Sequence, residues 1–233
     1  MNSRRSFLQS AALLGAGVLV AHSARAQGAA ASAAGSSAAP DFWTVVRSRR
    51  SVRRFKAGAP VPEEDVRRIL EATQLSATSG NQQPWKFLVV RDPAKIADLK
   101  AACLKAALEQ FDQHPSAKKD DRAAYEQRAR DTYDGYLSAP VYIVLLTDNE
   151  SRYPTYNHFD GPLAASTLML AARALGYGTV FLTDSIPDSI TKSVFKIPDR
   201  YTRVCITPIG VPEEWPKGPK KKPLDDMIVR ESF

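Results

Sequence analysis

The segment from Asp160 to Leu175 constrains the fold more than any other, because it combines helical composition with almost no charge. Asp160-Gly161-Pro162 is a typical helix start, and Arg173 is the only charged residue after it. A helix that is apolar on nearly every side has to be covered on every side. A chain of 233 residues forms one domain, or at most two, and offers limited material for that cover. We therefore expect a second copy of the chain to cover part of this helix, in a homodimer.

The other predicted elements do not alternate regularly between strand and helix. Residues 141–146 form a continuous apolar run between Pro140 and Asp148, which predicts a buried strand. A hydrophobic content of 44% and a charged content of 24% are ordinary for a globular protein. We expect an α+β fold rather than a doubly wound parallel sheet. The further helices are predicted at 41–48, from 62 to 73, from 93 towards 111 and at 123–137, and the further strands at 85–90, 179–183 and 204–209.

The first 40 residues resemble an export signal and a linker more than part of a folded domain. Arg4 and Arg5 precede an apolar run, 11–21, which is too short to cross a ~30 Å hydrocarbon layer as a helix. Ala24-Arg25-Ala26 has the small-x-small pattern of a cleavage site. The alternatives are a single N-terminal membrane anchor or a chance basic start. We predict a twin-arginine signal at 1–26, a flexible Ala/Ser/Gly linker at 27–40, a domain at 41–233 and a periplasmic location.

The charge balance argues against nucleic acid as a partner. The full chain has 32 Lys and Arg against 25 Asp and Glu. Without the three arginines of residues 1–26, the predicted mature chain has 29 basic residues against 25 acidic ones, a net charge of +4. This excess is too mild to indicate a polyanion partner.

Several chemistries lack the residues they need. The sequence has no Walker-type phosphate loop and no nucleophile-elbow serine, and its three His and two Cys are too scattered for a zinc site. Cys103 and Cys205 fall in apolar elements, where thiols are usually buried and inert. His158 beside Asp160 is expected to be a surface pair before a helix. With no acid–base–nucleophile set, a cofactor is expected to carry any chemistry.

A basic segment begins the predicted domain, with six basic residues between Arg47 and Lys56. Arg49, Ser51 and Arg53 alternate, so an extended backbone places all three on one side. Two guanidinium groups with a hydroxyl between them suit a phosphate. The alternatives are a solvated basic turn and a nucleic-acid patch. A second basic cluster, residues 220–222, lies near the C-terminus.

The residues from Ser76 to Trp85 lead from a helix into a strand. Their small hydroxyl residues, glycine and amides suit a loop that hydrogen-bonds the edge of a heteroaromatic ring or a polyol chain. An ordinary helix-to-strand turn explains the same composition.

Four segments, taken in order, resemble the FMN-dependent nitroreductase family. They are Arg-Arg-Ser-Val-Arg-Arg-Phe at 49–55, Ser-Gly-Asn-Gln-Gln-Pro-Trp at 79–85, the run 168–179 and the closing Lys-Lys-Lys-Pro-Leu-Asp-Asp-Met at 220–227. The resemblance spans roughly residues 42 to 229. It implies a central mixed, mostly antiparallel sheet flanked by helices, an intertwined homodimer and FMN as cofactor.

The resemblance also implies which residues contact FMN. Arg49 and Ser51 correspond to phosphate contacts, and Arg53 to a contact nearer the ribityl chain and ring. Two departures from the family pattern are Ser166-Thr167, where many members have an asparagine, and Lys222, where arginine is common. The full implied set is Arg49, Arg50, Ser51, Arg53, Lys220 and Lys222 of one chain, with Ala77, Thr78, Ser79 and Asn81 of the other.

The implied activity is a two-step transfer of a hydride or electrons through flavin N5 to a nitroaromatic, quinone or similar small acceptor. No dedicated catalytic residue is required, and Phe111, Tyr125 and Tyr133 are candidates to cover the substrate face. The family's usual donor is NAD(P)H, but export favours a periplasmic or membrane reductant. The alternatives are a flavin-consuming or dehalogenating relative on the same fold and a non-enzymatic flavin or electron carrier.

Overall fold

The computed structural model describes residues 40–115, 118 and 121–233. The predicted signal at 1–26 and all but the last residue of the predicted linker at 27–40 lie outside the described residues. The described residues form one compact unit. Within the described part of the chain, no helix combines the length and apolarity needed to cross a membrane.

The centre of this unit is a three-stranded antiparallel sheet in the order β1-β2-β3. The strands are β1 (Trp85–Val90), β2 (Val141–Asp148) and β3 (Tyr201–Ile209). β2 is buried along its whole length except at Asp148, because it has a strand on each side and helices on both faces. The predicted strands at 85–90 and 141–146 are confirmed, and the one at 204–209 begins earlier, at Tyr201.

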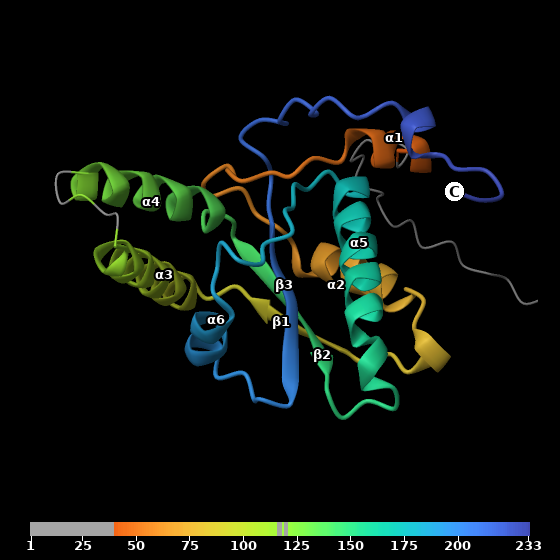
Figure 1. The fold of residues 1–233 in the computed structure, drawn as a ribbon, viewed down its shortest axis with the longest axis horizontal. Coiled ribbons are helices and arrows are strands. Elements are labelled where there is room, and N and C mark those ends of the chain that lie inside the picture. Colours follow the sequence, from red (N-terminus) through yellow and green to blue (C-terminus); the bar gives the residue numbers. More distant parts are fainter. Residues whose placement is uncertain (1–39, 116–117, 119–120) are drawn as a thin grey trace, which may run out of the picture. The chain divides into compact units, whose positions relative to one another are not determined.

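Helices cover both faces of the sheet (Figure 1). Tyr142 and Val144 lie on the face that packs against α3, α4 and α6, whereas Val141 and Ile143 lie on the face that packs against α2 and α5. The predicted α+β class is confirmed. The helices are α1 (Phe42–Ser48), α2 (Glu63–Gln74), α3 (Pro93–Gln113), α4 (Arg122–Tyr136), α5 (Asn157–Ala174) and α6 (Asp188–Phe195).

Local signals account for most helix ends. The Asp41 carboxylate caps α1 by accepting hydrogen bonds from the Trp43 and Thr44 backbone N–H groups, at 3.0 and 3.2 Å. α5 begins at Asn157, three residues before the predicted Asp160, because Asn157 Nδ2 donates to the carbonyl of Asp148 at 2.9 Å and anchors an earlier turn.

The predicted strand at 179–183 is wrong. This segment makes two separate single-residue bridges, a parallel one between Ser51 and Thr179 and an antiparallel one between Leu182 and Ile206. The segment pairs first with the basic segment, at Ser51, and then with β3, at Ile206, and runs alongside neither of them, so no continuous hydrogen-bonded ladder forms. The parallel bridge nevertheless fixes the basic segment beside the sheet.

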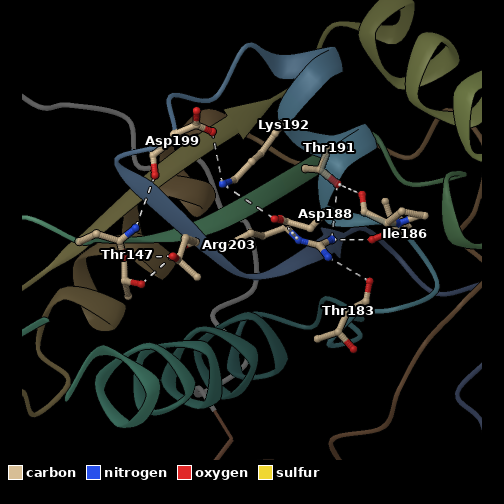
Figure 2. Close-up of polar contacts among 11 residues, drawn as sticks. Thr147, Thr183, Ile186, Asp188, Thr191, Lys192, Asp199 and Arg203 are labelled. Carbon is tan, nitrogen blue, oxygen red and sulfur yellow. Dashed lines mark hydrogen bonds and ion pairs between the residues drawn. The ribbon is translucent and has the colours of Figure 1, made fainter. Parts of the chain in front are cut away.

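Arg203 ties the start of α6 to β3, and its side chain is only 7% exposed. Its guanidinium donates from Nη1 to the Ile186 carbonyl at 2.8 Å and from Nη2 to the Thr183 carbonyl at 3.2 Å. Nε lies 3.1 Å from a carboxylate oxygen of Asp188 (Figure 2). Lys192 lies within 4.0 Å of the same carboxylate. We call these residues the Arg203 cluster.

The predicted apolar helix is only half covered by its own chain. Ala164 and Leu168 of α5 are fully buried toward the sheet, and α1 and α2 also contact this helix. On its outer side, Phe159 is 58% exposed and Leu163 is 50% exposed.

Candidate anion-binding site

A pocket of about 710 Å³ lies between the basic segment and the C-terminal residues that follow β3. Two stretches of chain, 46–53 and 216–221, supply its lining. We call it the cation pocket, because its lining includes six cationic side chains and no acidic one. They are Arg47, Arg49, Arg50, Arg53, Lys217 and Lys221.

The basic segment is held in place by two core residues, Val52 and Phe55, each 1% exposed. The Val52 N–H donates to the Thr179 carbonyl at 2.9 Å. Because neighbouring side chains of an extended backbone point to opposite sides, burying Val52 directs Ser51 and Arg53 outward to the pocket. Arg49 lines the same pocket. The prediction that Arg49, Ser51 and Arg53 share one side is therefore confirmed.

The six cations of the pocket have no carboxylate partner among the residues that the structure describes. Arg50 donates only to backbone carbonyls, from Nη1 to Arg47 at 2.6 Å and to Arg49 at 2.8 Å. Arg53 Nη1 donates to the Ser51 carbonyl at 3.3 Å. Like charges this close repel, and a bound anion offsets the repulsion. The pocket therefore fits a phosphate monoester, which carries about −1.5 to −2 charges at neutral pH.

The C-terminal wall of the pocket brings different lysines to it than the resemblance implies. All four lysines are exposed, but Lys217 and Lys221 line the pocket, whereas Lys220 and Lys222 do not. Gly218 lies against the Arg50 guanidinium, since a Cβ there would be 2.7 Å from Nη2. The role of Lys220 and Lys222 toward a cofactor stays a prediction.

The loop from Ser76 to Trp85 does not line the cation pocket of its own chain. Its centre is a 3-10 turn, η1 (Ser79–Asn81), joined to α5 through Asp160. One oxygen of this carboxylate accepts from the Ser79 N–H at 3.0 Å and from Ser79 Oγ at 3.1 Å. The other accepts from Gln82 Nε2 at 2.6 Å. Ala77 and Asn81 are exposed, and Thr78 is half-buried.

Two further contacts fix the shape of this loop. Gly80 has φ +56° and lies against the Tyr153 ring, where a Cβ would be 2.5 Å from a ring carbon. Ser76 Oγ donates to Thr167 Oγ1 at 2.8 Å, so a residue that departs from the family pattern anchors the start of the loop. Contacts within the chain therefore fix the conformation of this loop.

The sequence did not predict that Asp160 holds the loop. Asp160 is 1% exposed, whereas His158 is exposed, so the predicted surface pair of these two residues is wrong. The reason is that α5 begins before Asp160 and turns its carboxylate toward the loop. No local pattern links Asp160 to Gln82, which is 78 positions away in the sequence.

The aromatic candidates for a substrate face divide into two groups. Phe111 and Tyr125 stack on each other, with ring centroids 4.5 Å apart, where α3 and α4 meet. Tyr133 belongs to the core, and burial raises its pKa to about 12. Burial also raises the pKa of Cys103 to about 11 and that of Cys205 to about 12, so both stay protonated at neutral pH. In the described residues, no group of three His, Cys, Asp or Glu side chains could hold a metal ion.

Comparisons with known proteins agree in fold and cofactor type. The sequence model of the "Nitroreductase family" matches residues 46–211. 5,6-Dimethylbenzimidazole synthase from Rhodospirillum rubrum is 31% identical over 183 residues, covering 71% of this chain and 79% of that protein. The structure of oxidized iodotyrosine deiodinase bound to FMN and 3-iodo-L-tyrosine has a TM-score of 0.66 and 24% identity, covering 83% of this chain and 100% of the other. A putative nitroreductase in complex with FMN, from Desulfovibrio desulfuricans, has a TM-score of 0.60 and 26% identity, covering 83% and 98%.

Proposed function

Because the chain belongs to the nitroreductase family, we propose that it is an FMN-dependent oxidoreductase that reduces a nitroaromatic, a quinone or a similar small acceptor. The observation that carries the proposal is the cation pocket, whose six positive side chains have no carboxylate partner in the described part of the chain. A flavin phosphate supplies the missing negative charge.

The residues of the basic segment would hold the phosphate end of FMN. Arg49 and Arg50 provide guanidinium donors and Ser51 a hydroxyl, all on a backbone fixed to the sheet. When bound, FMN accepts a hydride or electrons from a donor and passes them to an acceptor through N5 of its ring.

Arg53 has a second task in this proposal. It lines the cation pocket and two neighbouring pockets, one with Glu213 and Glu214 and one with Tyr136 of α4. With FMN bound, Arg53 would stabilise the negative charge of the reduced flavin ring. The transfer requires no dedicated acid, base or nucleophile of the protein.

We further propose that the site is shared between two copies of the chain. The outer side of α5 and the exposed Phe42 and Trp43 of α1 supply apolar surface for such a homodimer. Asn81 and its neighbours in the loop would then meet the FMN of the partner. In isolated mixed dimers of Arg49→Ala and Asn81→Ala chains, one of the two sites is intact, so flavin and activity should recover to about half. No recovery, with each single variant clearly impaired, would contradict a shared site.

The location and the electron donor follow from the predicted export signal. Export of a folded, FMN-loaded protein by the twin-arginine route leaves it in the periplasm, away from cytosolic NAD(P)H. The proposed physiological donor is therefore a membrane quinol or a redox protein. Arg4→Lys with Arg5→Lys should leave folded, flavin-loaded protein in the cytosol, and normal export of this variant would contradict the proposal.

The direct test of the function is to purify the protein, identify its flavin and follow bleaching of the flavin by several donors in stopped-flow experiments. Bound FMN and turnover of a nitroaromatic or quinone are the expected results. A colourless protein that cannot be reconstituted with FMN would overturn the proposal, and flavin without turnover would favour an electron carrier.

A second candidate is dehalogenation or consumption of the flavin. The similarity of this chain to an iodotyrosine deiodinase structure and to 5,6-dimethylbenzimidazole synthase supports this second candidate. Iodide release from an iodinated phenol, or loss of flavin during aerobic turnover, would identify it.

A further inference from the structure

The segment from Glu214 to Lys222, which we call the C-terminal strap, carries two of the six pocket cations but is weakly attached to the domain. Its last backbone anchor is the N–H of Glu213, which donates to the Arg54 carbonyl at 3.2 Å. Across the described residues, no hydrogen bond or ion pair joins the strap itself to the rest of the chain. Figure 1 shows the chain beyond β3 passing beside α1.

The start of the strap is held by the stacking of Trp215 on Arg173, and Gly218 further along packs against Arg50. The Arg173 guanidinium carbon lies 4.2 Å from the centroid of the Trp215 ring, a close cation–π pair. Arg173 belongs to the last turn of α5, and its Nε donates to Ser48 Oγ at 3.1 Å. Ser48 ends α1 and directly precedes Arg49. Arg173 thus joins the start of the basic segment to the start of the strap.

This contact opposes the electrostatic repulsion among the cations that line the pocket. Lys217 and Lys221 approach four arginines, and nothing negative in the lining attracts them. Without an anchor, the repulsion favours a strap that moves away from the arginines. Trp215 lies two residues before Lys217, so its stacking on Arg173 fixes the position of the chain that leads to Lys217.

We propose that Arg173 and Trp215 are positioning residues that hold Lys217 and Lys221 at the cation pocket and thereby set the preference for FMN over riboflavin. The inference rests on the proposed function. It adds a determinant of specificity, outside the pocket lining, that acts only on the phosphate end of the flavin.

The test compares Trp215→Leu with Trp215→Phe by titrating the apoprotein with FMN and with riboflavin. Loss of the ring should weaken FMN binding about tenfold, on the scale of one charge-assisted contact, and leave riboflavin binding unchanged. Phenylalanine keeps an aromatic face for Arg173 and should restore most of the preference. Equal weakening of both ligands, or no weakening of FMN, would overturn the inference.

Two further variants control for misfolding and for the general effect of losing an aromatic ring. Arg173→Met should reproduce the Trp215→Leu result from the other side of the contact, even if one of the two variants folds poorly. Tyr201→Leu is the matched control, because it removes a ring that Arg200 covers at 5.7 Å on β3, away from the pocket. A change of the FMN-to-riboflavin ratio in this control equal to that of Trp215→Leu would also overturn the inference. Failure of the wild-type protein to prefer FMN would instead contradict the proposed function.

Discussion

The Arg203 cluster and the cation pocket both gather positive side chains beside the same sheet, but only one of them is neutralised by the chain. Arg203 is nearly buried and meets a carboxylate of Asp188 and two backbone carbonyls. Arg49 and Arg53 lie in the pocket and form no ion pair with any carboxylate of the described residues, although Glu213 and Glu214 line a neighbouring pocket with Arg53. Elsewhere the chain does pair arginines with carboxylates, as the ion pair between Arg200 and Asp148 shows.

This difference separates a structural use of charge from a binding use. A charge that is paired within the chain adds to the stability of the fold when its partners are well placed. Charges left unpaired together reduce stability until a ligand binds. The two clusters should therefore respond in opposite ways to mutation.

The largest effect is expected on removing the guanidinium of Arg203. Arg203→Met leaves the Ile186 and Thr183 carbonyls without their donor and Asp188 with only Lys192 as a cationic neighbour among the described residues, and should lower the free energy of unfolding by about 2–3 kcal/mol. The FMN affinity of the folded protein should not change. Urea unfolding of the apoprotein, followed by an FMN titration, measures both. A variant as stable as the wild type would contradict the claim that Arg203 stabilises the fold.

Next in size is the loss of FMN affinity in Arg49→Ala. Loss of one charge-assisted contact to the phosphate, with the other five cations of the pocket still present, should weaken binding by about 1.5–3 kcal/mol, or roughly 10- to 150-fold. The apoprotein should be as stable as the wild type or slightly more stable, because one repelling charge is gone. Titration calorimetry with FMN gives the affinity and thermal melting without FMN gives the stability. A lower Tm of the Arg49→Ala apoprotein with an unchanged FMN affinity would mean that Arg49 serves the fold and does not bind the phosphate.

A smaller effect is expected from inorganic phosphate on the apoprotein. At 10 mM phosphate and a Kd of about 1 mM, binding adds about 1.4 kcal/mol to the free energy of unfolding, and the Tm rises by a few degrees. Chloride at the same ionic strength is the control, and Arg49→Ala should lose most of the phosphate effect. Equal Tm values in phosphate and chloride would mean that the pocket does not select this anion.

The smallest expected effect concerns the two thiols, which are buried in the core. Burial raises the pKa of Cys103 to about 11 and that of Cys205 to about 12. Each thiol therefore stays protonated, and unreactive, until the pH rises toward these values. At pH 8, a disulfide reagent such as DTNB should modify neither thiol in the native protein and both after unfolding. Fast native reaction would show that at least one cysteine is accessible as a thiolate.

Sequence reasoning found the parts of the site that depend on local spacing. The alternation of Arg49, Ser51 and Arg53 predicts that they share one side, and all three line one pocket, although Arg50 between them lines it as well. The strand at 85–90 is marked by its composition and ends where predicted.

The parts that depend on distant contacts could not be found in this way. Asp160 reaches Gln82, and Arg173 reaches Trp215, only because α5 packs beside the loop and the strap. Among the C-terminal lysines, the path of the strap decides that Lys221 lines the pocket, and no spacing rule within the strap encodes that path.

The central claim is that the cation pocket holds the phosphate of FMN, and the most direct measurement is the affinity of the wild-type apoprotein for FMN and for riboflavin at low and high salt. The two ligands differ only by the phosphate. The account predicts that FMN binds at least tenfold more tightly at low salt, and that this advantage shrinks as salt screens the pocket. Equal affinities for FMN and riboflavin at low salt would contradict it.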